Sequence, residues 1–211
     1  MRTNNLKNLL GFFGIVLSLC ATTASASLSL DPSAGANDQA AYEKALEYLS
    51  RSPKAQEVIA KLQASETAYH IVIGLRPSMN PGDEPGNMYD PAIRTIYWMP
   101  SYGFRWKTLF SSLRITPALG LLHEMGHAYH QDIDSGTYEK DIKATMILWD
   151  TREEKRTIRE IENVVAKDLG ESLRNQHDYV MLNEGGQTGF YQTQGPISVE
   201  ASVSTFANLP L

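Results

Sequence analysis

Residues 123–127 read His-Glu-Met-Gly-His, and this pentapeptide constrains the fold more than any other part of the sequence. On an α-helix, residues four positions apart lie on one face about one turn apart, so His123 and His127 would point in the same direction. The motif follows Thr116 and Pro117, a helix cap with proline at the first helical position. The sequence therefore predicts a helix with two imidazoles on one face.

This arrangement indicates metal chemistry. Two imidazoles at this spacing can bind one tetrahedral zinc ion, so His123 and His127 are the expected ligands. Glu124 can reach a metal-bound water without binding the metal, and can take its proton as the water attacks a peptide carbonyl. Gly126 is a poor helix former, and its position between the ligands predicts close packing. The alternative is a structural histidine pair with ordinary surface roles.

The third ligand must come from elsewhere in the chain. One subclass continues the motif as H-x-x-G-x-x-H, but here the glycine position is His130 and the last histidine position is Ile133. Other proteins of this type supply a glutamate from a following helix. Residues 151–163 contain several glutamates, and the residues alone leave the choice among them open.

Residues 153–157, Glu-Glu-Lys-Arg-Thr, resemble the E-E-x-R-T motif of clostridial neurotoxin light chains. The wider pattern resembles the NleD-like effector zinc metallopeptidases of bacterial pathogens, over roughly residues 93–179. The resemblance implies an α+β, zincin-like domain in which a small sheet packs on an active-site helix and a following glutamate-bearing helix. The segments that carry it are 96–100, 123–130, 153–163, 169–170 and 174.

The resemblance implies that Glu154 is the third zinc ligand and that Glu153 holds a ligating imidazole. A different interpretation is available, because Thr151 with Glu154, like Asp150 with Glu153, also fits a helix capping box. The need for a third ligand favours Glu154. The next candidates along the segment are Glu160 and Glu162.

The neurotoxin light chains also place an arginine and a tyrosine, three residues apart, near the substrate carbonyl. Here Arg174 is followed by His177 at that spacing and by Tyr179 two residues later. The resemblance thus implies that Arg174, with either Tyr179 or His177, donates hydrogen bonds to the oxyanion. The alternative for Arg174 is a solvated charge at a helix end.

Hydrophobic periodicity and turn residues predict the remaining elements. The expected helices cover 38–50, 53–63 and 117–131, and a later helix is capped by Asp150 or Thr151 and stops near Gly170. The expected strands cover 69–75 and 93–99, with a loop at 76–90 between them and a loose lead-in at 27–37. We expect the second strand to run along the cleft as an edge that pairs with an extended substrate. Tyr129 should pack on the core, and His130 should face solvent.

The N-terminus has the composition of an export signal. Positive residues open it, an apolar run covers 9–19, and residues 24–26 read Ala-Ser-Ala, a pattern that signal peptidase cuts. We therefore expect a signal peptide at 1–26 and a zincin-like domain at 27–211. One alternative is an uncleaved anchor, for which the run is short of the required ~20 residues. The other is a lipoprotein modified at Cys20, although a bulky leucine precedes it.

Charge and cysteine content exclude several functions. The formal net charge is −5, so there is no basic surplus to attract nucleic acid. The single cysteine, Cys20, lies in the expected signal peptide, which excludes a disulfide framework in the mature chain. We expect a secreted or periplasmic protein with no stable membrane association after cleavage.

These observations predict a zinc-dependent endopeptidase that acts on a protein or peptide substrate, such as a secreted effector or toxin. Two alternatives stay open. The first is a non-catalytic zinc-binding module of the same fold, although the intact Glu124 argues against it. The second is a metal-dependent amide hydrolase that acts on cell-wall material.

Overall fold

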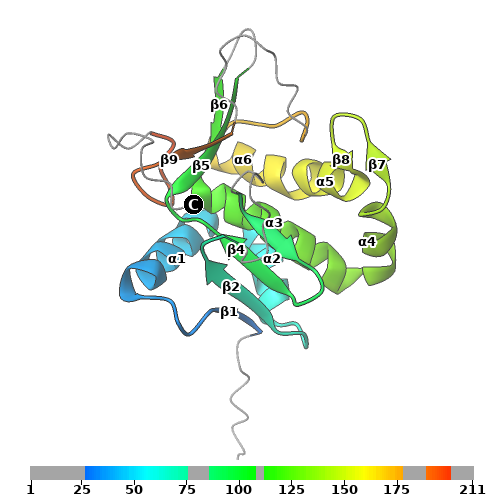
Figure 1. Ribbon diagram of the computed structural model, residues 1–211, viewed down its shortest axis with the longest axis horizontal. Helices are drawn as coiled ribbons and strands as arrows, with labels where there is room; N and C mark the ends of the chain where they lie inside the picture. Colours follow the sequence, from blue (N-terminus) through cyan, green and yellow to red (C-terminus); the bar gives the residue numbers. More distant parts are fainter. Residues whose placement is uncertain (1–26, 76–85, 108–111, 178–188, 201–211) are drawn as a thin grey trace, which may run out of the picture.

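Four short strands form the first sheet, in the order β1-β2-β4-β3 (Figure 1). β1, β2 and β4 are parallel, and β3 is antiparallel to β4. β2 reads Tyr-His-Ile-Val-Ile, a composition rich in the β-branched and aromatic residues that favour strands. The computed structural model describes residues 27–75, 86–107, 112–177 and 189–200. The strands are β1 (Leu28–Leu30), β2 (Tyr69–Ile73), β3 (Met88–Asp90) and β4 (Thr95–Trp98).

Three helices form the body that packs with this sheet: α1 (Ala36–Leu49), α2 (Pro53–Gln63) and α3 (Pro117–Ile133). α3 contacts α1 and α2, and it also contacts β3 and β4 of the sheet. Its start follows the sequence signals, because the Thr116 hydroxyl accepts a hydrogen bond from the Leu119 amide at 3.1 Å. α3 is therefore the central element, enclosed by the sheet and the helices.

A second helical layer follows α3 in the chain. Figure 1 shows this layer on the side of α3 opposite the four-stranded sheet. Its first part is α4 (Ser135–Asp141) and a hairpin of β7 (Thr145–Met146) and β8 (Asp150–Thr151). Its second part is one continuous helical rod made of α5 (Arg152–Thr157), a π-helical turn η1 (Ile158–Glu162) and α6 (Asn163–Leu169). α5 and η1 contact α3 directly.

A separate antiparallel sheet has the order β6-β5-β9. It consists of β5 (Tyr102–Lys107), β6 (Ser112–Ile115) and β9 (Gly189–Gln192), and β5 also contacts α3. The chain is thus an α+β protein, as the sequence predicts.

The hydrophobic core lies between the four-stranded sheet and helices α1, α2 and α3. Each fully buried aliphatic side chain there contributes roughly 1.5–3 kcal/mol to folding relative to an exposed one. Core side chains with no exposed surface include Leu49, Leu62, Ile71, Ile96, Leu122 and Met125.

Several predicted elements are confirmed within one or two residues: α1, α2, α3, β2 and β4. The predicted helix at 151–170 is also present and ends at Gly170, whose φ of 74° fits a glycine C-cap. Two expectations are wrong. The lead-in at 27–37 contains β1, and β4 is not an edge, because it lies between β2 and β3. The edge next to β4 is β3, inside the segment expected to be a loop.

The expected signal peptide at 1–26 lies outside the described residues. Within the described ranges, no helix is both long and apolar enough to cross a membrane.

Candidate metal centre

The three residues of the pentapeptide that carry chemistry lie on α3 and are buried. His123, Glu124 and His127 have 7%, 8% and 6% of their surface exposed. Gly126 lets the next helical layer approach, because a Cβ there would lie 2.8 Å from Thr157 Cγ2 and 3.3 Å from Ile161 Cδ1. The close packing predicted at Gly126 is therefore confirmed, and it brings α5 and η1 against the histidine-bearing face.

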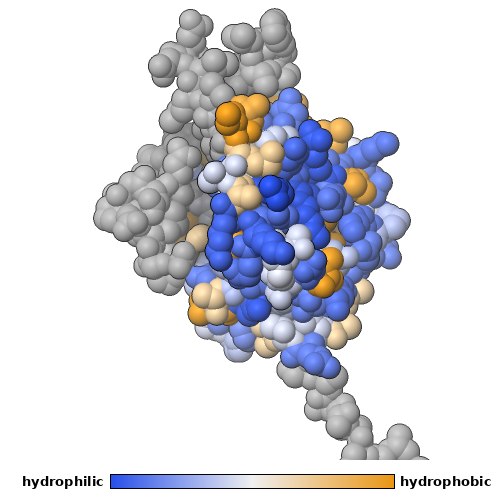
Figure 2. Space-filling model, turned by 90° about the vertical axis from the view of Figure 1, so that its right-hand side faces the viewer, coloured by the Kyte–Doolittle hydropathy of each residue, from blue (hydrophilic) through white to orange (hydrophobic). Residues whose placement is uncertain are grey.

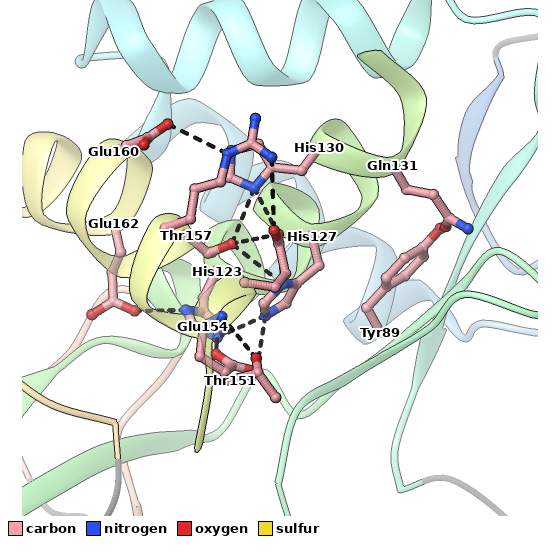
Figure 3. A network of polar contacts seen from close by, with 12 residues as sticks. Tyr89, His123, His127, His130, Gln131, Thr151, Glu154, Thr157, Glu160 and Glu162 are labelled. Atoms are coloured by element: carbon pink, nitrogen blue, oxygen red, sulfur yellow. Dashed lines mark hydrogen bonds and ion pairs between the residues drawn. The ribbon is translucent and has the colours of Figure 1, made fainter. Parts of the chain in front are cut away.

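The two imidazoles meet a glutamate from α5. The Nε2 atoms of His123 and His127 are 3.2 Å apart, and the Glu154 carboxylate lies 3.1 Å from the first and 3.3 Å from the second. One potential ligand atom from each residue lies within 4.8 Å of the others. Figure 3 shows all three side chains pointing toward one another. This group is close enough to hold a metal ion.

The chemistry of these donors fits a divalent cation. Glu154 Oε2 is buried, and its polar neighbours are two imidazole nitrogens, His123 Nε2 at 3.1 Å and His177 Nε2 at 3.4 Å. With Nδ1 protonated on both histidines, the two Nε2 lone pairs face each other and that oxygen. Such a set of two imidazoles and one carboxylate leaves one tetrahedral position open, as in catalytic zinc sites. The residues present therefore fit the metal that the sequence predicts.

The pKa shifts of the metal-free site also reflect how closely these histidines and glutamates lie together. Burial opposes the charge on His123, but hydrogen bonds with Glu154 and Glu162 outweigh it and raise its pKa to about 9. The pKa of His127 is also raised, and that of Glu154 is held well below its usual value by the two histidines despite burial. The site thus holds excess negative charge that attracts either protons or a cation.

A buried carboxylate lies behind His127. Glu153 Oε1 is 3.2 Å from His127 Nδ1 and 2.7 Å from His130 Nδ1, and it accepts a hydrogen bond from the Thr157 hydroxyl at 3.0 Å. Burial opposes ionisation of Glu153, but the two histidines lower its pKa to about 2. Glu153 therefore lies where it can fix the ring of His127 and its tautomer.

A second buried carboxylate lies behind His123. Glu162 Oε2 is 2.8 Å from His123 Nδ1, and Glu162 Oε1 forms an ion pair with Arg174 Nε at 2.8 Å. Arg174 is 6% exposed, so the alternative of a solvated surface charge is wrong. Its Nη2 lies 3.4 Å from His123 Nδ1. Arg174 therefore lies beside the Nδ1 side of His123, whereas Glu154 faces the Nε2 side.

Glu124 and His177 line a pocket of about 390 Å³ next to this group. Burial raises the pKa of the Glu124 carboxyl. His177 stacks on His123 with ring centroids 6.2 Å apart, and its Nε2 is 3.4 Å from Glu154. The pocket is also lined by residues of β3, α4 and β8. The other candidate from the sequence, Tyr179, lies outside the described residues.

Figure 2 shows the face of the molecule on the side of α4 and the β7–β8 hairpin. This face is mainly hydrophilic, with small separate hydrophobic areas. The most exposed large apolar side chain of the described residues is Ile147, at 91%, in that hairpin. A polar surface on this side is compatible with a polar, solvated ligand.

The sequence interpretation of two residues needs revision. His130 was expected to face solvent, but it is only 2% exposed and bonds to Glu153. A signal was present, since His123, His127 and His130 follow an i, i+4, i+7 pattern on one helical face. The sequence suggests Glu162 only as a further candidate for the third metal ligand, whereas the structure places it against Nδ1 of His123.

Comparison of the chain with protein-family models, with curated proteins and with solved structures finds no match.

Proposed function

We propose that this protein is a zinc-dependent endopeptidase with a zincin-like domain. The observation that carries the proposal is the convergence of His123, His127 and Glu154 within 4.8 Å, next to a pocket lined by Glu124. These three residues would hold the metal. Zinc bound there would act as a Lewis acid and lower the pKa of a bound water towards neutrality.

Glu124 is the proposed general base. It lines the pocket beside both ligand histidines but does not belong to the group of candidate ligands. Its raised pKa strengthens its basicity, because a carboxylate with a pKa nearer neutrality accepts a proton more readily. Glu124 would then hold the proton and deliver it to the leaving amine.

His177 is the proposed hydrogen-bond donor to the carbonyl oxygen of the substrate. It lines the pocket, and burial lowers its pKa, which keeps the ring neutral at pH 7 with one N–H to donate. The resemblance assigns this work to Arg174 as well. Arg174 lies beside Nδ1 of His123, on the side of the ring away from Glu154. A hydrogen bond from Arg174 to the oxyanion would therefore have to reach past the His123 ring.

The proposed substrate is a segment of a protein or peptide in the pocket between β3, α4 and the β7–β8 hairpin. Pocket-lining apolar side chains, such as Met88 and Ile142, offer contacts for substrate side chains beside the polar group. The export-type N-terminus supports a secreted or periplasmic enzyme, and the resemblance to effector peptidases supports a role as an effector or toxin.

The test compares the wild type with Glu124→Gln and with the control Glu160→Gln, whose side chain is 63% exposed on η1. Zinc content would be measured after reconstitution, and cleavage of casein would be measured with and without chelator. We expect about one zinc per chain in all three proteins and loss of activity only in Glu124→Gln. Zinc binding without any chelator-sensitive cleavage would favour a binding module, and cleavage of cell-wall amides alone would favour the other hydrolase class.

A further inference from the structure

Glu162 is the most enclosed charged residue of the site, with no exposed surface. Its two carboxylate oxygens have different partners. Oε2 lies 2.8 Å from His123 Nδ1, and Oε1 lies 2.8 Å from Arg174 Nε. Figure 3 shows Glu162 approaching His123 from η1, on the other side of the ring from Glu154. One carboxylate thus contacts both a candidate metal ligand and a buried guanidinium.

The π-helical turn explains how Glu162 reaches this position. In a regular α-helix, the eight residues from Glu154 to Glu162 would leave the two side chains about 80° apart around the axis, at about 100° per residue. A π turn accommodates one extra residue and removes about 100° of that rotation, so the side chains come within about 20° of each other. The π turn covers Ile158–Glu162 and therefore ends at the residue whose direction it changes.

The contact has a defined chemical consequence for His123. If Nδ1 of the neutral ring, the form that binds a metal, donates its proton to Glu162, the lone pair lies on Nε2, which faces Glu154 and His127. Arg174 neutralises the buried carboxylate, which would otherwise bear a large desolvation penalty. Burial opposes ionisation of Glu162, but Arg174 and His123 keep its pKa below the usual value.

We propose that Glu162, turned inward by the π turn η1, is a positioning residue that fixes the tautomer and ring of His123 and holds Arg174 beside it. The proposal rests on the metal centre proposed above. His127 has a corresponding partner in Glu153, but that carboxylate is shared with His130 and Thr157. Glu162 instead joins one candidate metal ligand, His123, to the only buried guanidinium of the site within the described residues.

The test uses Glu162→Ala, the double variant Glu162→Ala/Arg174→Met and the control Glu160→Ala. Glu160 is a matched control because it lies on the same turn with a 63% exposed side chain and a loose ion pair to Arg156 at 3.6 Å. Zinc affinity would be measured by competition with a chelator. The double variant removes the guanidinium that Glu162→Ala would leave buried and unpaired, so at least one variant should fold.

We expect both Glu162 variants to bind zinc about 10–100-fold more weakly, and Glu160→Ala to bind it like the wild type. A second measurement does not need the metal. In ¹⁵N-histidine NMR spectra of the metal-free protein, the hydrogen-bonded Nδ1 proton of His123 should disappear in the Glu162 variants and persist in Glu160→Ala.

A folded double variant with wild-type zinc affinity would overturn the role of Glu162 and leave the proposed function intact. A wild-type protein that binds no zinc would overturn both. An unchanged Nδ1 signal in the Glu162 variants would show that the contact itself does not exist in solution.

Discussion

Helix α3 has two buried faces of opposite chemistry. One face contributes Leu121, Leu122 and Met125 to the apolar core, and all three side chains are fully buried. The other face presents His123 and His127 to glutamates from α5 and η1. Both faces are buried, but the polar face also lines the pocket, and its charged groups need partners that the apolar face does not need.

The difference follows from what burial costs each kind of group. Burial of aliphatic surface is favourable and independent of pH or ligands. Buried charges lose hydration and recover the loss only through well-placed partners. On the polar face, the two histidines take up protons and so become cationic partners of the buried glutamates. A bound metal ion would replace those protons. The apolar face should therefore determine stability, and the polar face should determine affinity for zinc.

The largest expected effect is on the polar face, in the adjacent pair Glu153 and Glu154. Glu154→Ala removes a carboxylate that lies 3.1 Å and 3.3 Å from the two imidazole Nε2 atoms, so zinc affinity should fall by more than about 100-fold. Glu153→Ala removes a carboxylate that contacts His127 Nδ1 from behind but is not one of the three candidate ligands, and affinity should fall about 10–100-fold. Chelator competition on both variants checks the order.

The capping-box interpretation gives a different result for the same pair. The Thr151 hydroxyl does accept a hydrogen bond from the Glu154 amide at 3.1 Å. If capping were the only role of this segment, both variants would keep zinc and each would lose about 1 kcal/mol of stability. A larger loss of zinc in Glu153→Ala than in Glu154→Ala would move the ligand assignment back by one residue.

The matching change on the apolar face is Leu122→Ala. Leu122 is fully buried in the core, so the free energy of unfolding should fall by about 2–5 kcal/mol. Zinc affinity of the folded variant should stay within about threefold of the wild type, because the ligands do not change. Urea unfolding of the metal-free protein and chelator competition would measure the two quantities. A large drop in zinc affinity would show that the two faces are not independent.

Most helices were predictable because their signals are local. Thr116 and Pro117 predict the start of α3, and Gly170 predicts the end of α6. The structure has both boundaries within one residue of these predictions. β5, β6 and β9 were not predicted. β5 and β6 pair as a local hairpin, but the pairing that adds β9 joins residues about 90 positions apart, which no local pattern indicates. β3 was hidden in a segment rich in Pro, Gly and Asn, and only its pairing with β4 makes it a strand.

The site was predictable as far as helical periodicity allows. The spacing of His123 and His127 and the resemblance at Glu154 pointed to three residues that the structure brings together. Glu162 could not be placed from the sequence, because a constant 100° per residue puts it on a different face from Glu154. η1 packs against α3, and no local residue pattern indicates the π turn.

A smaller effect should appear in the pH dependence of the metal-free protein. Despite burial, Glu154 and Glu162 raise the pKa of His123 from 6.5 to about 9. A raised pKa in the folded state stabilises the protein below the unfolded value, and this contribution is lost as the pH rises towards 9. The chelated protein should therefore melt at a lower temperature at pH 9 than at pH 6.5.

The zinc-loaded protein should not show this loss, because its histidines are already deprotonated and zinc binding releases protons. Melting curves with zinc and with chelator between pH 6 and pH 9 would compare the two forms. A metal-free protein that gains stability over this range would contradict the assignment of the imidazoles as the titrating groups.

Gly126 lies on the boundary between the two faces, and Gly126→Ala should disturb both by small amounts. Alanine favours the helix by about 1 kcal/mol over glycine. However, its Cβ would lie 2.8 Å from Thr157 Cγ2, and overpacking of this kind costs roughly 1–3 kcal/mol. We expect a net loss of stability of about 1 kcal/mol, measured by urea unfolding. The control is Gly136→Ala in α4, where the added Cβ would meet only Asp134 Oδ1 at an ordinary 3.7 Å.

The effect of Gly126→Ala on zinc affinity tests whether the site needs the close approach of α5 and η1 to α3. The clash pushes Thr157 away from α3, and the Thr157 hydroxyl donates to Glu153, which contacts His127. Zinc affinity should therefore fall by several-fold in Gly126→Ala, in contrast to Leu122→Ala, where stability changes and affinity does not. If Gly126→Ala keeps full affinity, α5 and η1 tolerate a shift away from α3, and the close approach at Gly126 matters only for packing.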